Sequence, residues 1–140
     1  ILAKSLELNS NSRMIGSSPL VWVGDPDLVS DSQQPVPLAL FDEGCVYRRA
    51  AVSTLNSAGR CWEATVISPG LSAIHAAVIA GVAIAPLAEC FVPSEFNKIS
   101  TGLPPLPQVC FTLTIAKAAE SKPEVQRFLE LMTVSGLTFN

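Results

Sequence analysis

The sequence predicts an α/β fold in which apolar strands alternate with helices around a mostly parallel sheet covered on both faces. Short apolar runs such as "LVWV" and "PLALF" alternate with segments whose apolar residues recur at helical spacing. Hydrophobic residues make up 49% of the 140 residues and charged residues only 15%, a composition that supplies a core and is not that of a disordered chain. We therefore expect a three-layer α/β/α arrangement, as one domain or part of a larger one.

The first half of the chain contains two apolar strands and a helix. Residues 20–23 form a strand that is entered through Pro19 and left through an Asp-Pro turn, and residues 37–41 form a second, buried strand. A helix over 45–58 follows and ends at Gly59, where a left-handed cap is expected. Residues 61–68 alternate between apolar and polar, as a half-exposed strand does.

The second half repeats this alternation. Ser68 is expected to cap a helix with Pro69 in its first position and Gly81 just past its end. A buried strand at 82–87, a proline-rich loop and a strand at 109–117 come next. A last helix opens with the capping box Ser121–Glu124. Its apolar residues are expected to form one core-facing stripe: Val125, Phe128, Leu129 and Met132.

Charge and cysteine usage exclude several classes of function. The net charge is −3 and the nine basic residues are scattered, which argues against a nucleic-acid surface on this chain. No apolar run approaches the roughly 20 residues that span a bilayer, and the first residues lack the pattern of a signal peptide. The first residue is not Met, so we expect the chain to be a piece of a longer protein.

The four cysteines indicate no metal centre. They contain no CxxC pair and fit no zinc spacing, so we expect reduced side chains that act as small hydrophobes in a reducing, cytoplasmic compartment. No motif indicates a cofactor.

Two turns are candidates for a binding site. In a parallel sheet, ligands bind beyond the carboxyl ends of the strands, where helices begin with unpaired N–H groups. The turns "FDEGC" and "ISPG" each lie between a strand and a helix. They predict a rim for a small polar ligand, and the dipoles of the two helices favour an anionic one.

Five blocks in this order carry a family resemblance. "PLVWVG", "PLALFDEGCVYRRAAVSTLNSAG", "SPGLSAIHAAVIAGVAIAPL", "GLPPLPQVCFTLTIA" and "SKPEVQRFLELM" resemble the C-terminal effector-binding domain of LysR-type transcriptional regulators. That domain has the type 2 periplasmic-binding-protein fold, with two α/β subdomains facing each other across a cleft. The resemblance implies that residues 1–18 end subdomain I and begin a crossing segment, that residues 19–92 form subdomain II, and that residues 93–140 hold the return crossing and the last strand and helix of subdomain I.

The resemblance also implies a function. A small metabolite would bind between the subdomains of a bacterial, non-enzymatic regulator and alter transcription, with DNA contacted only by a winged helix-turn-helix outside this chain. The family dimerises, here through helix 45–58 and strand 61–67. The acidic pair Asp42 and Glu43 stands where many members have Ser or Thr. These carboxylates would repel an anionic effector, so the expectation of an anionic effector is weakened. The effector-binding residues carried over are Asp42, Gly44, Cys45, Val46, Arg48, Ser68, Pro69 and Gly70.

Several alternatives stay open. The chain could be a free-standing periplasmic-type binding protein, or a small enzyme with Cys45 or Glu43 as its reactive group. His75, the only histidine, is expected to be a partly buried side chain, with a ligand or pH-sensing role as the alternative. Of Arg48 and Arg49, one is expected to hold a backbone carbonyl or an acid and the other to be solvated. Trp22 could line the cleft or pack in the core.

Overall fold

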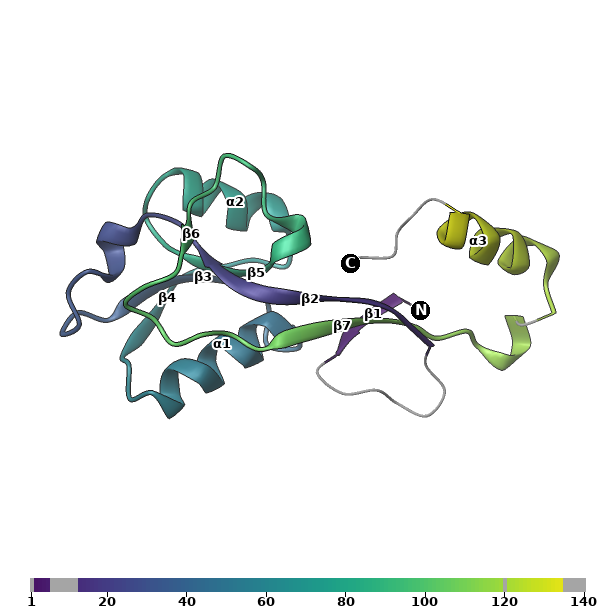
Figure 1. Ribbon diagram of the computed structural model, residues 1–140, viewed down its shortest axis with the longest axis horizontal. Coiled ribbons are helices and arrows are strands. Elements are labelled where there is room, and N and C mark those ends of the chain that lie inside the picture. Colours follow the sequence, from purple (N-terminus) through teal and green to yellow (C-terminus); the bar gives the residue numbers. More distant parts are fainter. Residues whose placement is uncertain (1, 6–12, 120, 135–140) are drawn as a thin grey trace. The chain divides into compact units, whose positions relative to one another are not determined.

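The computed structural model describes residues 2–5, 13–119 and 121–134, which fall into two compact units. The larger unit is Pro19–Pro107, and the smaller one contains the described residues of 1–18 and 108–140. Figure 1 labels the helices and strands in chain order. They are β1 (Leu2–Ser5), β2 (Arg13–Val23), β3 (Val36–Leu40), α1 (Val46–Ser57), β4 (Trp62–Ile67), α2 (Leu71–Ile79), β5 (Ala85–Ala88), β6 (Lys98–Ile99), β7 (Gln108–Leu113) and α3 (Pro123–Val134), with short 3-10 helices at Pro26–Val29, Glu89–Phe91 and Lys117–Ala119.

The sheet of the larger unit has a parallel centre. β3 pairs in parallel with β4, and on its other side Leu38 forms a parallel bridge with Ile84, just before β5. β2 then pairs antiparallel with both β5 and β6. The α/β class is confirmed, and so is the parallel alignment of β3 with β4. The antiparallel direction of β2 could not be predicted, because the apolar pattern of a strand does not indicate which way the strand runs.

Two hydrophobic cores lie on opposite faces of this sheet because successive strand residues point to opposite sides. Leu38 and Leu40 of β3 pack with Leu55 of α1, whereas Ala39 packs with Ile74 of α2. Figure 1 shows α1 and α2 on the two sides of β3 and β5. The expected three layers are therefore present within this unit.

Both predicted glycine stops are confirmed. Gly59 and Gly81 each have a φ of 65°, the left-handed conformation that ends α1 and α2. Helix α1 has its N-cap at Cys45 and its C-cap at Ala58, the bounds expected from the sequence.

The expected start of α2 is wrong. The N-cap is Gly70 rather than Ser68, and Pro69 lies before the helix instead of in its first position. The Ser68 hydroxyl oxygen accepts from the Gly70 N–H at 3.1 Å, so the serine closes a local turn that competes with capping.

The proline-rich segment packs on the larger unit, which extends to Pro107. The Trp22 indole N–H donates to the Pro104 carbonyl at 2.9 Å, and Leu103 and Leu106 lie against the core on the α1 face. Trp22 is 3% exposed. Of the two roles considered for Trp22, the structure therefore shows core packing.

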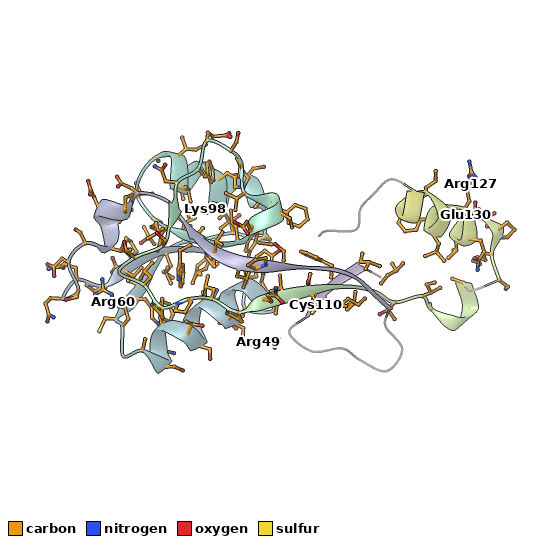
Figure 2. All side chains as sticks on the ribbon, viewed as in Figure 1. Arg49, Arg60, Lys98, Cys110, Arg127 and Glu130 are labelled. Atoms are coloured by element: carbon orange, nitrogen blue, oxygen red, sulfur yellow. The ribbon has the colours of Figure 1, made fainter. Side chains whose placement is uncertain are left out.

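An arginine fixes the long polar loop before β3. The Arg60 guanidinium donates to the carbonyls of Asp31 at 2.9 Å and Gln34 at 3.1 Å, and also to that of Ser32. Figure 2 shows Arg60 beside this loop. Five N–H donors in one planar group suit such a set of converging oxygens.

In the smaller unit, β1 pairs antiparallel with β7. Helix α3 begins at Pro123, one residue later than the predicted capping box implies, and the Lys122 carbonyl accepts from the N–H groups of Val125 at 3.0 Å and Gln126 at 3.1 Å. Of the expected core-facing stripe, Val125 and Leu129 are half-buried, whereas Phe128 is 53% exposed. The Met132 side chain lies outside that part.

Among the described helices, none has the length and apolar character needed to cross a bilayer.

Candidate functional site

The two turns singled out from the sequence lie side by side at the carboxyl ends of the parallel strands in the larger unit's sheet. The first follows β3 and the second follows β4, which runs parallel to β3. The Ser68 N–H donates to the Leu40 carbonyl at 3.0 Å and ties the second turn to the end of β3. The parallel pairing therefore brings together two segments that are more than twenty residues apart in the chain.

The first turn is closed by its backbone and open to solvent. The Cys45 N–H donates to the Asp42 carbonyl at 2.9 Å, and Asp42, Glu43 and Gly44 are exposed. A Cβ added at Gly44 would meet nothing within 4 Å. Cys45 is the N-cap of α1 but makes no side-chain capping bond. Its side chain therefore leaves the first-turn N–H groups of α1 uncapped.

The second turn also leaves the helix that follows it without a side-chain cap. Gly70, the N-cap of α2, has no side chain, and the Ser68 hydroxyl bonds to the Gly70 backbone instead of to the helix. Two helices thus begin at one edge of the sheet without a side-chain cap. This arrangement favours a ligand with hydrogen-bond acceptors, and the helix dipoles favour negative charge.

Arg48 supports the first turn. Its Nη1 donates to the Phe41 carbonyl at 3.1 Å, and its Nη2 lies 4.0 Å from the Glu43 carboxylate. The expectation that one of the two neighbouring arginines ties down backbone or an acid is confirmed for Arg48. Arg49 is exposed. Direct contact between Arg48 and an effector stays a prediction.

Val46 offers only its backbone N–H at the first turn, because its side chain is buried. Its side chain is 5% exposed and belongs to the buried interior of the larger unit. Its N–H, by contrast, is one of the first-turn donors of α1.

Sequence reasoning missed a third segment at this edge. Cys90 lies in the short 3-10 helix directly after β5, the neighbour of β3, and α1 packs against β5. Burial raises the pKa of the Tyr47 phenol above its ordinary value of 10.0, and the Cys90 and Cys45 thiols, when ionised, raise it further. Tyr47 is 2% exposed. The order of the strands would have revealed this segment, but a single sequence does not give that order.

The geometry does not support a nucleophile–base pair. His75 lies on α2 and forms an edge-to-face contact with Phe96, with ring centroids 5.0 Å apart, whereas Cys45 lies at the start of α1 on the other face of the sheet. Residues 2–5, 13–119 and 121–134 also contain no group of three or more His, Cys, Asp or Glu side chains placed to hold a metal ion.

A shallow groove of about 530 Å³ runs along the outer face of α1. The Trp62 indole N–H donates to the Asn56 side-chain oxygen at 2.9 Å and links β4 to α1 at one end of the groove. The residues that line it are Glu43, Arg48, Arg49, Val52, Ser53, Asn56, Ser57 and Trp62.

Comparison with known proteins points to one family. Residues 5–134 match the family described as "LysR substrate binding domain". The chain is 35% identical over 106 residues to the HTH-type transcriptional regulator DgdR of Burkholderia cepacia, an alignment that covers 74% of the chain and 36% of that relative.

Solved structures show the same fold. The chain is similar to the regulatory domain of HypT from Salmonella typhimurium, with a TM-score of 0.67, 15% identity and coverage of 96% of this chain and 72% of the other. It is also similar to the CcmR regulatory domain of Synechocystis PCC6803 in complex with 2-PG, with a TM-score of 0.63, 17% identity and coverage of 96% and 73%. At these identities the likeness shows the fold alone.

Proposed function

The chain belongs to the LysR substrate-binding domain family, and on that premise we propose that the edge formed by its two turns is one wall of an effector site. A small polar molecule would bind there through Asp42, Gly44, Cys45, Val46, Arg48, Ser68, Pro69 and Gly70. The observation that supports this most directly is the pair of helices, α1 and α2, that begin at one edge without a side-chain cap.

Each group has a distinct proposed role. The first-turn N–H groups of α1 and α2 would donate to acceptor atoms of the ligand. Gly44 and Gly70 would let the ligand approach the backbone closely. Arg48 would hold the first turn in shape through the Phe41 carbonyl, and the exposed Asp42 would select against excess negative charge.

The chain spans 36% of the length of DgdR, so the activity of the whole protein is part of the proposal. We propose that residues 19–92 form one subdomain, that residues 1–18 hold the end of a second subdomain and a crossing segment, and that residues 93–140 hold the return crossing segment and the last strand and helix of the second subdomain. Effector binding would favour one orientation of the two and so change how a separate DNA-binding segment meets its promoter, which requires only differential affinity and no catalysis. The name of DgdR, a transcriptional regulator, supports a cytoplasmic location.

A second surface would serve self-association. β4 has a free edge in the described pairings, where β3 is its only partner, and Ala64 is exposed on it. An unpaired edge strand beside the α1 groove is suited to pairing with another copy. The replacement Ala64→Lys is expected to weaken dimers in sedimentation experiments, whereas Ala73→Lys, on the exposed face of α2, should not. Equal effects of the two replacements would contradict this assignment.

The effector site is tested by amide chemical shifts of the chain titrated with 2-PG and with neutral and cationic compounds of similar size. We expect the shifts that change to cluster in residues 42–48 and 68–73. The replacement Gly44→Glu should abolish them without a steric clash, since the space beside Gly44 is open. Ser57→Glu, which adds the same charge at the far end of α1, is the matched control. Shifts centred elsewhere, or unchanged binding by Gly44→Glu, would contradict the proposal.

A further inference from the structure

A cavity of about 440 Å³ lies at the carboxyl end of α2, away from the two turns of the candidate site. Helix α2 begins at the second turn, and Val78 and Ile79 at its other end line the cavity. Gly24, which follows β2, lines it too, and β2 ends beside the start of β5 because Val23 pairs with Ala85. The cavity therefore lies at the amino end of β5, whereas the two turns follow the carboxyl ends of β3 and β4.

The walls of the cavity are held by contacts within the larger unit. The Gly24 N–H donates to the Asn97 carbonyl at 3.0 Å and joins two of the segments that line it. The Phe96 ring makes its edge-to-face contact with His75, and the Phe96 N–H donates to the Pro93 carbonyl at 3.0 Å. The cavity is therefore formed by the fold itself, as small-molecule sites usually are.

The cavity carries negative charge without a matching cation. Its charged lining residues are Asp25 and Glu95, and no Lys or Arg among the described residues lines it. Neither carboxylate belongs to an ion pair of the described chain, and Lys98, labelled in Figure 2, is itself paired with Glu89 at 2.7 Å. The last carbonyl groups of α2 add the partial negative charge of a helix carboxyl end. The cavity therefore favours a positively charged ligand.

The rest of the lining indicates an organic cation rather than a metal ion. The Asp27 N–H donates to Oδ1 of Asp25 at 2.9 Å, which fixes this carboxylate and leaves its other lone pairs for a ligand. Val78, Ile79 and Phe96 supply apolar surface, against which a hydrocarbon group would be buried. A metal ion would gain nothing from that surface, and the described residues contain no group of three or more His, Cys, Asp or Glu side chains placed to hold one.

We propose that this cavity binds a small organic cation, an alkylammonium or arylalkylammonium ion, at a site separate from the effector site. The ammonium group donates to the carboxylates of Asp25 and Glu95, and Asn97 offers a further polar contact. The hydrocarbon part packs on Phe96 and Ile79, whose side chain is 72% exposed. A volume of about 440 Å³ suits such a ligand, since small-molecule sites measure roughly 300–1,000 Å³.

The test is a titration of the chain with benzylammonium chloride, followed by amide chemical shifts. We expect the shifts of residues 24–27, 79–82 and 95–97 to change. These residues are distinct from residues 42–48 and 68–73 of the proposed effector site, so the two sites are observed separately. Benzyl alcohol, a neutral molecule of similar shape, should bind more weakly at the cavity, and benzoate should not bind there. Added sodium chloride should weaken the binding of benzylammonium, because the carboxylates are exposed.

Four replacements test the lining. Asp25→Asn and Glu95→Gln each remove one charge and keep the size of the side chain, so each should weaken binding about two- to fivefold. Asp31→Asn is the matched control, because the exposed Asp31 accepts from the N–H two residues later, as Asp25 does, but does not line the cavity. Ile79→Lys places an ammonium group at an exposed position of the lining and should abolish binding. Urea unfolding midpoints show that each variant folds.

Four results would overturn the proposal: unchanged shifts at the cavity, equal binding of benzyl alcohol, an equal loss of affinity in Asp31→Asn, or the same shifts with magnesium chloride at the same concentration. The last result would mean that the two carboxylates attract any cation. None of these readouts depends on effector binding, so this proposal and the proposed function fail separately.

Discussion

Replacing Tyr47 with Phe gives a sharp test of how the first turn of α1 is buried. Tyr47 is 2% exposed, and its pKa in the folded protein is raised above the ordinary 10.0, first by burial and then by the Cys90 and Cys45 thiols. A raised pKa means that the folded state holds the phenol proton more tightly than the unfolded chain does. This contribution to stability is fully present below about pH 10 and is lost as the pH rises toward the folded pKa.

The size of the effect follows from proton linkage. Above about pH 10 the unfolded chain releases one proton that the folded chain keeps, so the free energy of unfolding falls by about 1.4 kcal/mol per pH unit. The Tyr47→Phe variant lacks this proton. Between about pH 9 and about pH 11, we therefore expect the wild type to lose about 1.4 kcal/mol more than the variant, because the other titrating groups are shared.

The assay is urea unfolding of both proteins across this pH range, together with the ultraviolet absorbance of tyrosinate. The chain contains a single tyrosine, so that absorbance reports Tyr47 alone. Tyrosinate is expected to appear only as the protein unfolds. If it appears near pH 10 while the circular dichroism is still native, or if the two proteins lose stability in parallel, the argument from burial is refuted.

Three further predictions concern stability and are measured by urea unfolding at neutral pH. Arg60→Ala should lower the free energy of unfolding by about 2 kcal/mol, about 1 kcal/mol for each of its two well-formed hydrogen bonds to loop carbonyls. Arg60→Lys should recover part of this loss. A decrease of less than about 0.5 kcal/mol would mean that other contacts hold the loop. Leu38→Ala, at a side chain with no exposure, should cost about 2–5 kcal/mol, and an unchanged midpoint would contradict the assignment of the core. Gly81→Ala should destabilise by about 1 kcal/mol because its φ is 65°, whereas Gly44→Ala should be neutral or stabilising, and the reverse order would contradict the backbone assignment.

The larger unit could be predicted from the sequence because its signals are local. The apolar run of β3, the helical spacing of α1 and the glycine after each helix depend only on neighbouring residues, and the structure confirms them. The two turns between a strand and a helix were also found, because a strand followed directly by a helix is itself a local pattern. Whether they bind an effector stays a prediction.

What sequence reasoning missed depends on contacts between distant segments. Arg60 contacts a loop that ends about 26 residues before it, and no periodicity marks such a bond. The Cys90 thiol, when ionised, raises the pKa of Tyr47, and the sequence does not show that β5, which precedes Cys90, lies beside β3. The role of Ser68 was wrongly predicted for a different reason. Its hydroxyl could either cap the helix or close a local turn, and the sequence does not indicate which of the two hydrogen bonds forms.

The Arg60 contacts also bear on where the chain would accept a graft. Residues 30–35 are all exposed and polar or proline, and by composition they look like the natural place to insert a tag or to open a circular permutant. Their carbonyls, however, converge on one guanidinium, so an insertion there would displace several oxygens together. The exposed turn at residues 100–102 has no such anchor among the side-chain bonds of the described chain, and it is the better place for an insertion.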